Sequence, residues 1–432
     1  MNYDAVIFDL DGTVTESAPG IMKSVSYALN KMGKPVPSED VLRKFVGPPL
    51  HKSFMEFCGL TDEEADTAVK TYRERHAVIG WKEAVVYSGI LPMLLSLKKN
   101  GAYIALASSK PLPLCEKTLE YFGLLPLFDR VVGPDFQNKS GEKEYLIKKA
   151  LPDHYKNACM VGDRKFDIEG AKKAGVTAVG VGYGYGSEEE LKESGCDLYA
   201  ETVDDLSNLL LGSAPRAKGM FITFEGSDGC GKSTQMKLLK EYLLSCGARL
   251  TVTREPGGCE ISERIRSLVL DVKAMGMTDE CEALLFAAAR SQHVKDVIKP
   301  AVESGKIVLC DRYVDSSIAY QGGGRGLGSW VKVINEKAVA GCMPDLTLLF
   351  DIDAEEALRR RKNATGADRI ESAQSGFMTD VYNAFMALSK EEPERIKVID
   401  ANGEIEQIAS RVRQMVTDKI LTLSLRSEKT EG

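Results

Sequence analysis

The sequence predicts an α/β protein made of two doubly wound parallel-sheet domains. Three observations lead to this prediction. The 432 residues are too many for one ordinary core and suggest two or three domains. Short apolar runs alternate with helical stretches in both halves, which is typical of parallel strands joined by crossover helices. An apolar strand leads into a glycine-rich loop at 226–234, so a second unit of this type begins near the middle of the chain.

The first half contains four apolar runs with the length and composition of buried strands. They are 5–8, 103–107, 158–161 and 178–181. Residues from about 16 to 86 interrupt the alternation, because they are poor in strands and include a long helical run from Thr61 to Arg75. We therefore expect a domain at 1–212 that carries an inserted helical cap at about 16–86.

The second half follows a short segment, 213–219, whose small, polar and proline-containing sequence is typical of a linker. Five further segments are predicted to be the strands of a second parallel sheet. They are 221–225, 249–254, 307–310, 346–350 and 396–399. We expect this second domain to occupy 220–432, with a charged and frayed tail at its end.

Composition excludes several classes of protein. The net charge of −7 gives no broad basic surface for nucleic acid. No apolar stretch is long enough to cross a bilayer, and the N-terminus lacks the basic start and apolar core of a signal peptide. The ten cysteines form no Cys-x-x-Cys pair and there are only four histidines, which argues against zinc and favours free thiols. We expect a cytoplasmic protein with neither nucleic-acid nor membrane partners.

A phosphate-binding loop is predicted at 226–234, which fits the pattern Gly-x-x-x-x-Gly-Lys-Ser. Its glycines let backbone N–H groups turn toward phosphate oxygens at a helix N-terminus. Lys232 would reach the β- and γ-phosphates of ATP, and Ser233 would hold Mg²⁺. The residues expected to bind ATP are Gly226, Gly229, Gly231, Lys232, Ser233 and Thr234. The preceding strand and the helical run that follows disfavour an ordinary glycine-rich turn.

Four further segments narrow the type of enzyme. In chain order they are Thr-Arg-Glu-Pro-Gly-Gly at 253–258, Leu-Leu-Phe-Ala-Ala-Ala-Arg-Ser-Gln-His at 284–293, Asp-Arg-Tyr at 311–313 with Ser-Ser-Ile-Ala-Tyr-Gln-Gly at 316–322, and Asp-Arg-Ile-Glu at 368–371. Together with the phosphate loop, they resemble the thymidylate kinase family over nearly all of 220–425. The resemblance implies transfer of the ATP γ-phosphate to dTMP, giving dTDP, and a homodimer formed through this half. Another monophosphate, such as dUMP, stays open as the acceptor.

The resemblance also implies a role for each matching residue of the acceptor site. Asp228 would accept a hydrogen bond from the sugar 3′-hydroxyl, Phe286 would stack on thymine and Arg290 would hydrogen-bond the base. Arg254 and Arg312 would hold the acceptor phosphate, since planar guanidinium groups suit phosphate oxygens. The other expected contacts are Ser317 and Gln321 near the base, Tyr320 near the sugar and Asp311 on the Mg²⁺ side.

A catalytic arginine is expected in a lid segment, because Gly229 occupies the loop position where some members of the family carry it. The candidates are Arg360 and Arg361. The run departs from the family spacing, with Lys362 and Ala364 where some relatives carry arginine. A solvated basic helical face is the alternative explanation for either arginine.

Two carboxylates follow the first strand of the chain. Asp9 and Asp11 are two residues apart at a strand end, so both can face one site. One can attack phosphorus while the other handles the leaving-group proton. Polar residues follow later elements in a fixed order: Ser-Ser-Lys at 108–110, Lys143, and Gly-Asp-Arg-Lys-Phe-Asp at 162–167. The set resembles the haloacid dehalogenase superfamily over roughly 1–210.

This second resemblance implies a phosphatase mechanism. Asp9 would form an aspartyl-phosphate, and Asp11 would act first as general acid and then as general base. Ser108 and Lys143 would bind the phosphoryl oxygens, with Lys139 as an alternative to Lys143. The residues expected around Mg²⁺ are Asp9, Asp11 through its carbonyl, Asp163 and Asp167.

The cap bears on the choice of substrate. Its segment Phe-Val-Gly-Pro-Pro-Leu at 45–50 resembles the phosphoglycolate phosphatase-like branch, and Ala-Ser-Ser-Lys-Pro at 107–111 resembles its 5′-nucleotidase-type members. The implied substrate is a small phosphomonoester, either a nucleotide or phosphoglycolate. We thus expect a bifunctional enzyme. The alternative is a kinase whose first domain only senses a ligand or mediates assembly, against which the complete catalytic set of that domain argues.

Overall fold

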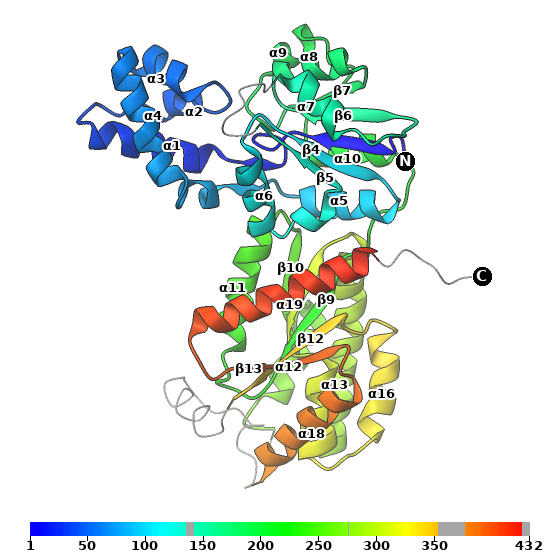
Figure 1. Cartoon of the computed structure of the whole chain (residues 1–432). Coiled ribbons are helices and arrows are strands. Elements are labelled where there is room, and N and C mark those ends of the chain that lie inside the picture. The colour runs from blue at the N-terminus through cyan, green and yellow to red at the C-terminus, as the bar shows by residue number, and fades with distance from the viewer. Residues whose placement is uncertain (135–141, 275, 353–375, 426–432) are drawn as a thin grey trace. The chain divides into compact units, whose positions relative to one another are not determined.

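The computed structural model describes residues 1–134, 142–274, 276–352 and 376–425. The chain divides into two compact units (Figure 1). The first is mainly Met1–Ala217, and the second comprises Lys218–Leu244 and Arg249–Leu423. Within the described part of the chain, no helix combines the length and apolarity needed to cross a membrane.

The first unit is built on a six-stranded sheet in the order β5–β4–β1–β6–β7–β8, in which all pairs are parallel. The strands are β1 (Ala5–Phe8), β4 (Tyr103–Ala107), β5 (Arg130–Val132), β6 (Ala158–Gly162), β7 (Thr177–Val181) and β8 (Leu198–Ala200). The order reverses at β1, which lies between β4 and β6. Side chains that follow these three strands therefore meet at one edge of the sheet.

Helices flank this sheet on its two faces (Figure 1). The helices are α5 (Ile90–Lys99), α6 (Leu112–Tyr121), α7 (Lys143–Ala150), α8 (Lys165–Ala174), α9 (Glu188–Glu193) and α10 (Val203–Leu211), with a 3₁₀ turn η2 (Leu125–Leu127). Ala5 and Ile7 of β1 belong to a buried cluster with Leu146 of α7 and Ile168 of α8. The whole of β1 is buried, which explains why its sequence is a continuous apolar run rather than an alternating one.

The inserted segment of the first unit is a helical cap (Figure 1, blue). It consists of α1 (Ala18–Lys31), α2 (Glu39–Arg43), α3 (Leu50–Cys58), α4 (Asp62–His76) and a 3₁₀ turn η1 (Gly80–Glu83). The cap has its own buried cluster, in which Phe45 packs edge-on against Phe54. Thr61 caps α4 in a reciprocal pair with Glu64. A short antiparallel pair, β2 (Thr15–Glu16) with β3 (Val85–Val86), joins both ends of the cap to the sheet domain.

The second unit is built on a five-stranded parallel sheet in the order β10–β11–β9–β12–β13. The strands are β9 (Phe221–Glu225), β10 (Leu250–Arg254), β11 (Ile307–Asp311), β12 (Leu346–Asp351) and β13 (Ile396–Asp400). The helices are α11 (Lys232–Ser245), α12 (Glu260–Val269), α13 (Asp279–His293), α14 (Lys299–Glu303), α15 (Val314–Ser317), α16 (Trp330–Val339), α18 (Phe377–Glu391) and α19 (Ile405–Leu425), with π-helical turns η3 (Val294–Ile298) and η4 (Ile318–Gly324). These two sheets confirm the predicted fold class.

Strand register places the chemistry of the second unit at one edge of its sheet. Arg254 pairs with Asp311, and Asp311 pairs with Phe224, the neighbour of Glu225. The last residues of β9, β10 and β11 therefore lie side by side. On one face of the sheet, Phe221 of β9 packs into a buried cluster with residues of η3, α14 and α16.

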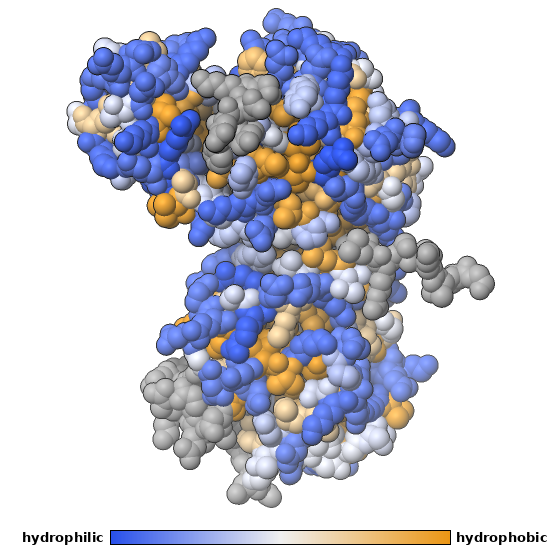
Figure 2. Space-filling model, viewed as in Figure 1, coloured by the Kyte–Doolittle hydropathy of each residue, from blue (hydrophilic) through white to orange (hydrophobic). Residues whose placement is uncertain are grey.

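The surface is mostly polar. In the view of Figure 2, hydrophilic residues dominate both units and hydrophobic ones form separate patches. All ten cysteines lie among the described residues and none forms a disulfide.

Candidate active sites

The first site forms where β1, β4 and β6 end. Phe8 is in register with both Leu106 and Val161, so the residues that follow these strands are neighbours. Asp9, Ser108 and Asp163 are all buried there. The structure therefore brings these three predicted site residues together at one edge of the sheet.

Lys143 is the cation at the centre of this site. It is the first residue of α7, and its Nζ lies 2.6 Å from Asp9 Oδ1 and 2.6 Å from Asp167 Oδ1. Burial raises the pKa of the Asp9 carboxyl to about 6, against the opposing effect of Lys143. Burial lowers the pKa of Lys143, but the charges of Asp167 and Asp9 outweigh it and raise that pKa above the ordinary value. Lys139, the alternative to Lys143, lies outside the described residues.

Three carboxylates of this site converge closely enough to share a cation. Carboxyl oxygens of Asp9, Asp163 and Asp167 lie within 4.8 Å of one another. Burial, together with the neighbouring Asp167 and Asp9 charges, raises the pKa of Asp163 well above its ordinary value. Crowded and buried carboxylate oxygens of this kind suit Mg²⁺, which offsets their mutual repulsion.

Backbone atoms surround the Asp163 carboxylate closely. One N–H group binds it, and the nearby glycine leaves no space for a side chain. The Tyr185 N–H donates to Asp163 Oδ2 at 2.7 Å. Gly12 has a φ of +94°, and a Cβ atom there would lie 2.2 Å from Asp163 Oδ2. The glycine of Asp-Leu-Asp-Gly-Thr is thus needed both for its conformation and for its lack of a side chain.

Asp11 has a partner that the sequence did not suggest. The Lys110 Nζ lies 3.1 Å from Asp11 Oδ1 and 3.3 Å from Oδ2. The carboxyl of Asp11 is not part of the three-carboxylate cluster. Lys110 was visible as the third residue of the Ser-Ser-Lys motif, but nothing in the sequence pairs it with Asp11. The arrangement leaves Asp11 outside the cation cluster and available for proton transfer.

The second site begins with the loop between β9 and α11. Gly226, Gly229 and Gly231 all have positive φ, between 85° and 130°. Lys232 is buried at the start of α11, and its Nζ donates to the carbonyls of Gly226 at 3.0 Å and Ser227 at 2.8 Å. Ser233 and Thr234 follow it in exposed positions. The lysine is thus held by carbonyl groups of the loop itself.

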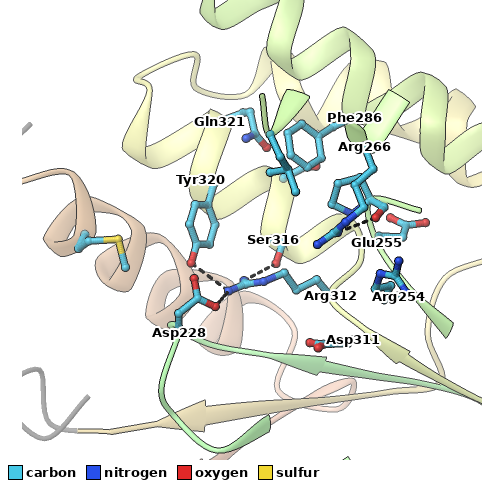
Figure 3. Close-up of a pocket in the computed structure, with 14 residues that line it drawn as sticks. Asp228, Arg254, Glu255, Arg266, Phe286, Asp311, Arg312, Ser316, Tyr320 and Gln321 are labelled. Atoms are coloured by element: carbon cyan, nitrogen blue, oxygen red, sulfur yellow. Dashed lines mark hydrogen bonds and ion pairs between the residues drawn. The ribbon is translucent and has the colours of Figure 1, made fainter. Parts of the chain in front are cut away.

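A cavity of about 260 Å³ adjoins this loop. Figure 3 shows Phe286 and Gln321 toward one end, and Asp228, Asp311 and Arg312 toward the other. The predicted acceptor-site residues that line it are Asp228, Arg254, Phe286, Asp311, Arg312, Ser317, Tyr320 and Gln321. An aromatic ring at one end and cations at the other suit a molecule with a planar base and an anionic group.

Arg312 has the most constrained geometry in the cavity. Its φ of 66° is rare for a residue with a side chain. Its NH2 group donates to Asp228 Oδ1 at 2.7 Å and to the Tyr320 hydroxyl at 3.2 Å, and its NH1 group to Ser316 Oγ at 3.1 Å. The dashed lines of Figure 3 mark these contacts. The guanidinium group is thus fixed from three sides at the polar end of the cavity.

Arg254, the other expected phosphate ligand, is more exposed. It pairs with Glu263 Oε2 at 3.0 Å. The other oxygen of Glu263 accepts from the Gly258 N–H at 2.8 Å, so the carboxylate also orders the loop after β10. Reorientation of Arg254 would therefore break only an exposed ion pair, which contributes little to stability.

Arg290 does not line the cavity, in contrast to the other predicted acceptor-site residues. It is 1% exposed. Its donors go to Glu255 Oε2 at 2.8 Å, Ser317 Oγ at 3.0 Å, Tyr313 O at 3.0 Å and Asn335 Oδ1. The side chain is thus a buried support beneath the base end, because four of its five N–H groups are engaged within the protein.

Asp311 and Gln321 differ in whether their side-chain polar atoms have hydrogen-bond partners. Asp311 Oδ1 is buried and has no hydrogen-bond partner in the described part of the structure. An unpaired buried carboxylate oxygen beside a phosphate loop fits a metal-side role. Gln321 donates from Nε2 to Glu282 Oε1 at 2.8 Å, which fixes its amide at the base end.

The remaining functional candidates of the second unit are the predicted lid arginines and one buried carboxylate. Arg360 and Arg361 fall outside the described residues, so the lid arginine stays a prediction. Glu225, the residue before the loop, was not singled out from the sequence, yet burial and the charge of Asp315 raise the pKa of its carboxyl to about 7. Its place at the end of an apolar strand, directly before the phosphate loop, was the one signal that could have found it.

Comparisons with known proteins match each half of the chain to a different family. A model of the thymidylate kinase family matches residues 224–412, and a model of haloacid dehalogenase-like hydrolases matches residues 6–181. A thymidylate kinase of Exiguobacterium sibiricum is 46% identical over 195 residues, which are 45% of this chain and 92% of that protein. A thymidylate kinase of Geobacter sp. strain M21 is 43% identical over 212 residues, or 48% of this chain and 94% of that protein.

Two solved structures match one half each. The structure of a predicted phosphatase from Clostridium acetobutylicum is 42% identical and covers 49% of this chain and 99% of its own, with a TM-score of 0.45. The structure of thymidylate kinase from Ehrlichia chaffeensis is 36% identical and covers 46% of this chain and 98% of its own, with a TM-score of 0.38.

Proposed function

The chain belongs to the thymidylate kinase family through its second half and carries a haloacid dehalogenase-like hydrolase in its first half, and from this premise we propose the reaction of each half. The second half phosphorylates dTMP to dTDP with ATP and Mg²⁺. The first half hydrolyses a small phosphomonoester with Mg²⁺ through an aspartyl-phosphate.

The kinase proposal rests above all on the polarity of the cavity next to the phosphate loop. Phe286 provides a face for stacking a base, and Arg312 provides a fixed guanidinium group for the acceptor phosphate. Asp228 and Tyr320 both bond Arg312. In this proposal Asp228 accepts from the sugar 3′-hydroxyl, and Tyr320 lies near the sugar and disfavours a ribose. The base, sugar and phosphate of a deoxynucleoside monophosphate thus find matching groups in order.

Phosphoryl transfer in this site is mostly placement and charge neutralisation. An acceptor phosphate oxygen attacks the γ-phosphorus of ATP, and the bond to the bridging oxygen of ADP breaks. Lys232 neutralises the β- and γ-phosphates, and Arg312 aligns the attacking phosphate. Asp311 and Ser233 are the residues that would hold Mg²⁺, which supplies further charge neutralisation. Arg360 or Arg361 completes the site from the lid.

ADP release with a panel of acceptors tests this assignment. We expect turnover with dTMP, weaker turnover with dUMP, and little with the ribonucleotide. Phe286→Ala should raise KM for dTMP much more than KM for ATP, because the ring faces only the acceptor cavity. Equal use of purine and pyrimidine monophosphates would contradict the assignment.

In the phosphatase, the residues around Lys143 perform the chemistry. An Asp9 oxygen attacks phosphorus while Asp11 donates a proton to the leaving oxygen. Asp11 then removes a proton from the water that hydrolyses the aspartyl-phosphate. Lys143 and Ser108 bind the phosphoryl oxygens, and Lys110 orients Asp11. The three-carboxylate cluster described above is the set that would hold Mg²⁺.

The substrate of the phosphatase is a 5′-nucleotide or phosphoglycolate. A phosphatase that preferred dTMP would remove the substrate of its own partner domain, so we propose a different or damaged nucleotide. Phosphate release should be measured with 5′-monophosphates, deoxy and ribo, and with phosphoglycolate, in Mg²⁺ without ATP. Asp9→Asn is the matched control, since it keeps the shape and removes the nucleophile. The proposal fails if dTMP is the best substrate.

We also propose that the chain forms a homodimer through the second unit. Ile261 and Leu268 of α12 and Leu284 of α13 are each about half exposed, which is unusual for side chains of this size. They lie on two helices that pack against each other. Leu284→Glu should convert the dimer to a monomer in light scattering after size exclusion, and an unchanged mass would contradict this interface.

A further inference from the structure

Glu225 is a buried carboxylate that the mechanism above does not use. It is the last residue of β9 and is 0% exposed. The next residue, Gly226, begins the phosphate loop. A buried carboxylate is costly unless its oxygens receive hydrogen bonds, so its partners indicate its purpose.

Among the residues that the structure describes, the hydrogen-bond donors to Glu225 come from the segment after Arg312. Its Oε1 accepts from the Tyr313 N–H at 2.8 Å and from the Ser316 N–H at 3.3 Å. Its Oε2 accepts from the Ser316 hydroxyl at 2.5 Å. Glu225 therefore binds the start of α15, which immediately follows the arginine of the acceptor site.

The contact with Ser316 determines how that serine meets Arg312. A serine hydroxyl carries one hydrogen, and Glu225 receives it. The Ser316 oxygen is thereby left with lone pairs, one of which accepts from Arg312 NH1 at 3.1 Å. Without the carboxylate, the hydroxyl could rotate and turn its hydrogen toward the guanidinium group.

The fold of α15 does not depend on Glu225 alone. Asp315, on the same short helix, forms a two-point ion pair with Arg395, with contacts of 2.6 Å and 2.8 Å. Thr347 of β12 also donates to Asp315, at 3.1 Å. Because the helix is anchored independently, a role in orienting Arg312 is separable from a role in holding the helix.

We propose that Glu225 is a positioning residue for the kinase reaction, which acts through Ser316 to hold Arg312 toward the acceptor phosphate. Since Gly226 follows it, the same residue ties the acceptor arginine to the loop that binds the donor phosphates. The inference rests on the proposed dTMP kinase function. It adds a residue and a route that the sequence motifs did not identify.

The test is a double-mutant cycle with Glu225→Gln, Ser316→Ala and the combination, in the full chain. Loss of one bond that orients a charged group should lower kcat/KM for dTMP roughly tenfold or more. KM for ATP should stay within about twofold of wild type. Because both residues act on one bond, the double variant should be little worse than either single variant.

Thr347→Val is the matched structural control. It also removes a buried hydroxyl that is bonded to Asp315, but the partners of that hydroxyl are Asp315, Thr223 and Arg395 rather than Ser316 or Arg312. It should lower Tm without changing KM for dTMP. Binding of dTMP, followed by calorimetry in the absence of ATP, gives a second readout that should weaken in Glu225→Gln and not in Thr347→Val.

Three outcomes would overturn the proposal: wild-type KM for dTMP in Ser316→Ala, additive effects in the cycle, or a change in Tm alone in Glu225→Gln. If Glu225→Gln does not fold, Ser316→Ala decides by itself, because it removes the oxygen through which the effect passes. If the wild-type chain turns over another monophosphate and not dTMP, the kinase assignment fails instead, and the same cycle is read with that acceptor.

Discussion

The buried position of Arg290 predicts that Arg290→Met destabilises the second unit as well as weakening its activity. Removing the guanidinium group leaves the Glu255 carboxylate, which is 4% exposed, with His293 at 3.0 Å as its one ionisable partner in the described part of the chain. It also removes donors from Tyr313 O and Asn335 Oδ1. Breaking a buried ion pair from one side costs about 3–5 kcal/mol. For a unit of roughly 200 residues, this corresponds to a fall in Tm of about 6–20 °C.

Thermal unfolding of the full chain measures this effect. The transition of the second unit is identified as the one that shifts upward when dTMP and ATP are added. Arg254→Met is the control of matched chemistry, because Arg254 lies at the same cavity but forms only an exposed ion pair with Glu263. Its loss should cost less than about 1 kcal/mol. The reasoning is refuted if the two variants lower Tm by the same small amount.

Three further predictions concern the first unit. Gly12→Ala should abolish phosphate release from a chromogenic phosphomonoester, because the added Cβ would lie 2.2 Å from Asp163 Oδ2. ADP formation with dTMP should stay intact. Retained hydrolysis would contradict the described backbone. Chelation by EDTA should stop phosphate release, and added Mg²⁺ should restore it. In Asp163→Asn, the same Mg²⁺ concentration should not restore phosphate release, because one carboxylate of the cluster is gone. Lys110→Met should lower kcat of hydrolysis about 10- to 100-fold by freeing Asp11, and an unchanged kcat would show that Asp11 needs no such partner.

Much of the architecture could be predicted because buried parallel strands leave continuous apolar runs. The run at 221–225, for example, is β9 at Phe221–Glu225, and all five of its residues are buried. The edge strands β5 and β8 were missed, since each has three residues of which one is buried, too few to make a pattern. The cap was predictable because its helices carry strong local signals, such as the capping pair of Thr61 and Glu64.

The sequence motifs predicted which residues belong to each site, but not which partners those residues contact. The resemblance to haloacid dehalogenases implied that Asp9, Lys143 and Asp167 share one site, and the structure places Lys143 Nζ 2.6 Å from a carboxyl oxygen of each aspartate. The burial of Arg290 and the pairing of Lys110 with Asp11 were not predictable, because they depend on which side chains the tertiary fold places opposite them. A sequence pattern predicts the helix or strand on which a residue lies and the face that it occupies. It does not predict the partners that other segments of the chain provide.

The central claim is that one chain carries two separate phosphoryl-transfer sites. The most direct measurement follows both reactions in the full-length wild type, in Asp9→Asn and in Lys232→Ala. We expect Asp9→Asn to lose phosphomonoester hydrolysis and keep dTMP-dependent ADP formation, and Lys232→Ala to show the reverse, because each residue is buried within its own site. Hydrolysis that persists in Asp9→Asn, or either variant losing both activities while still folded, would contradict the account.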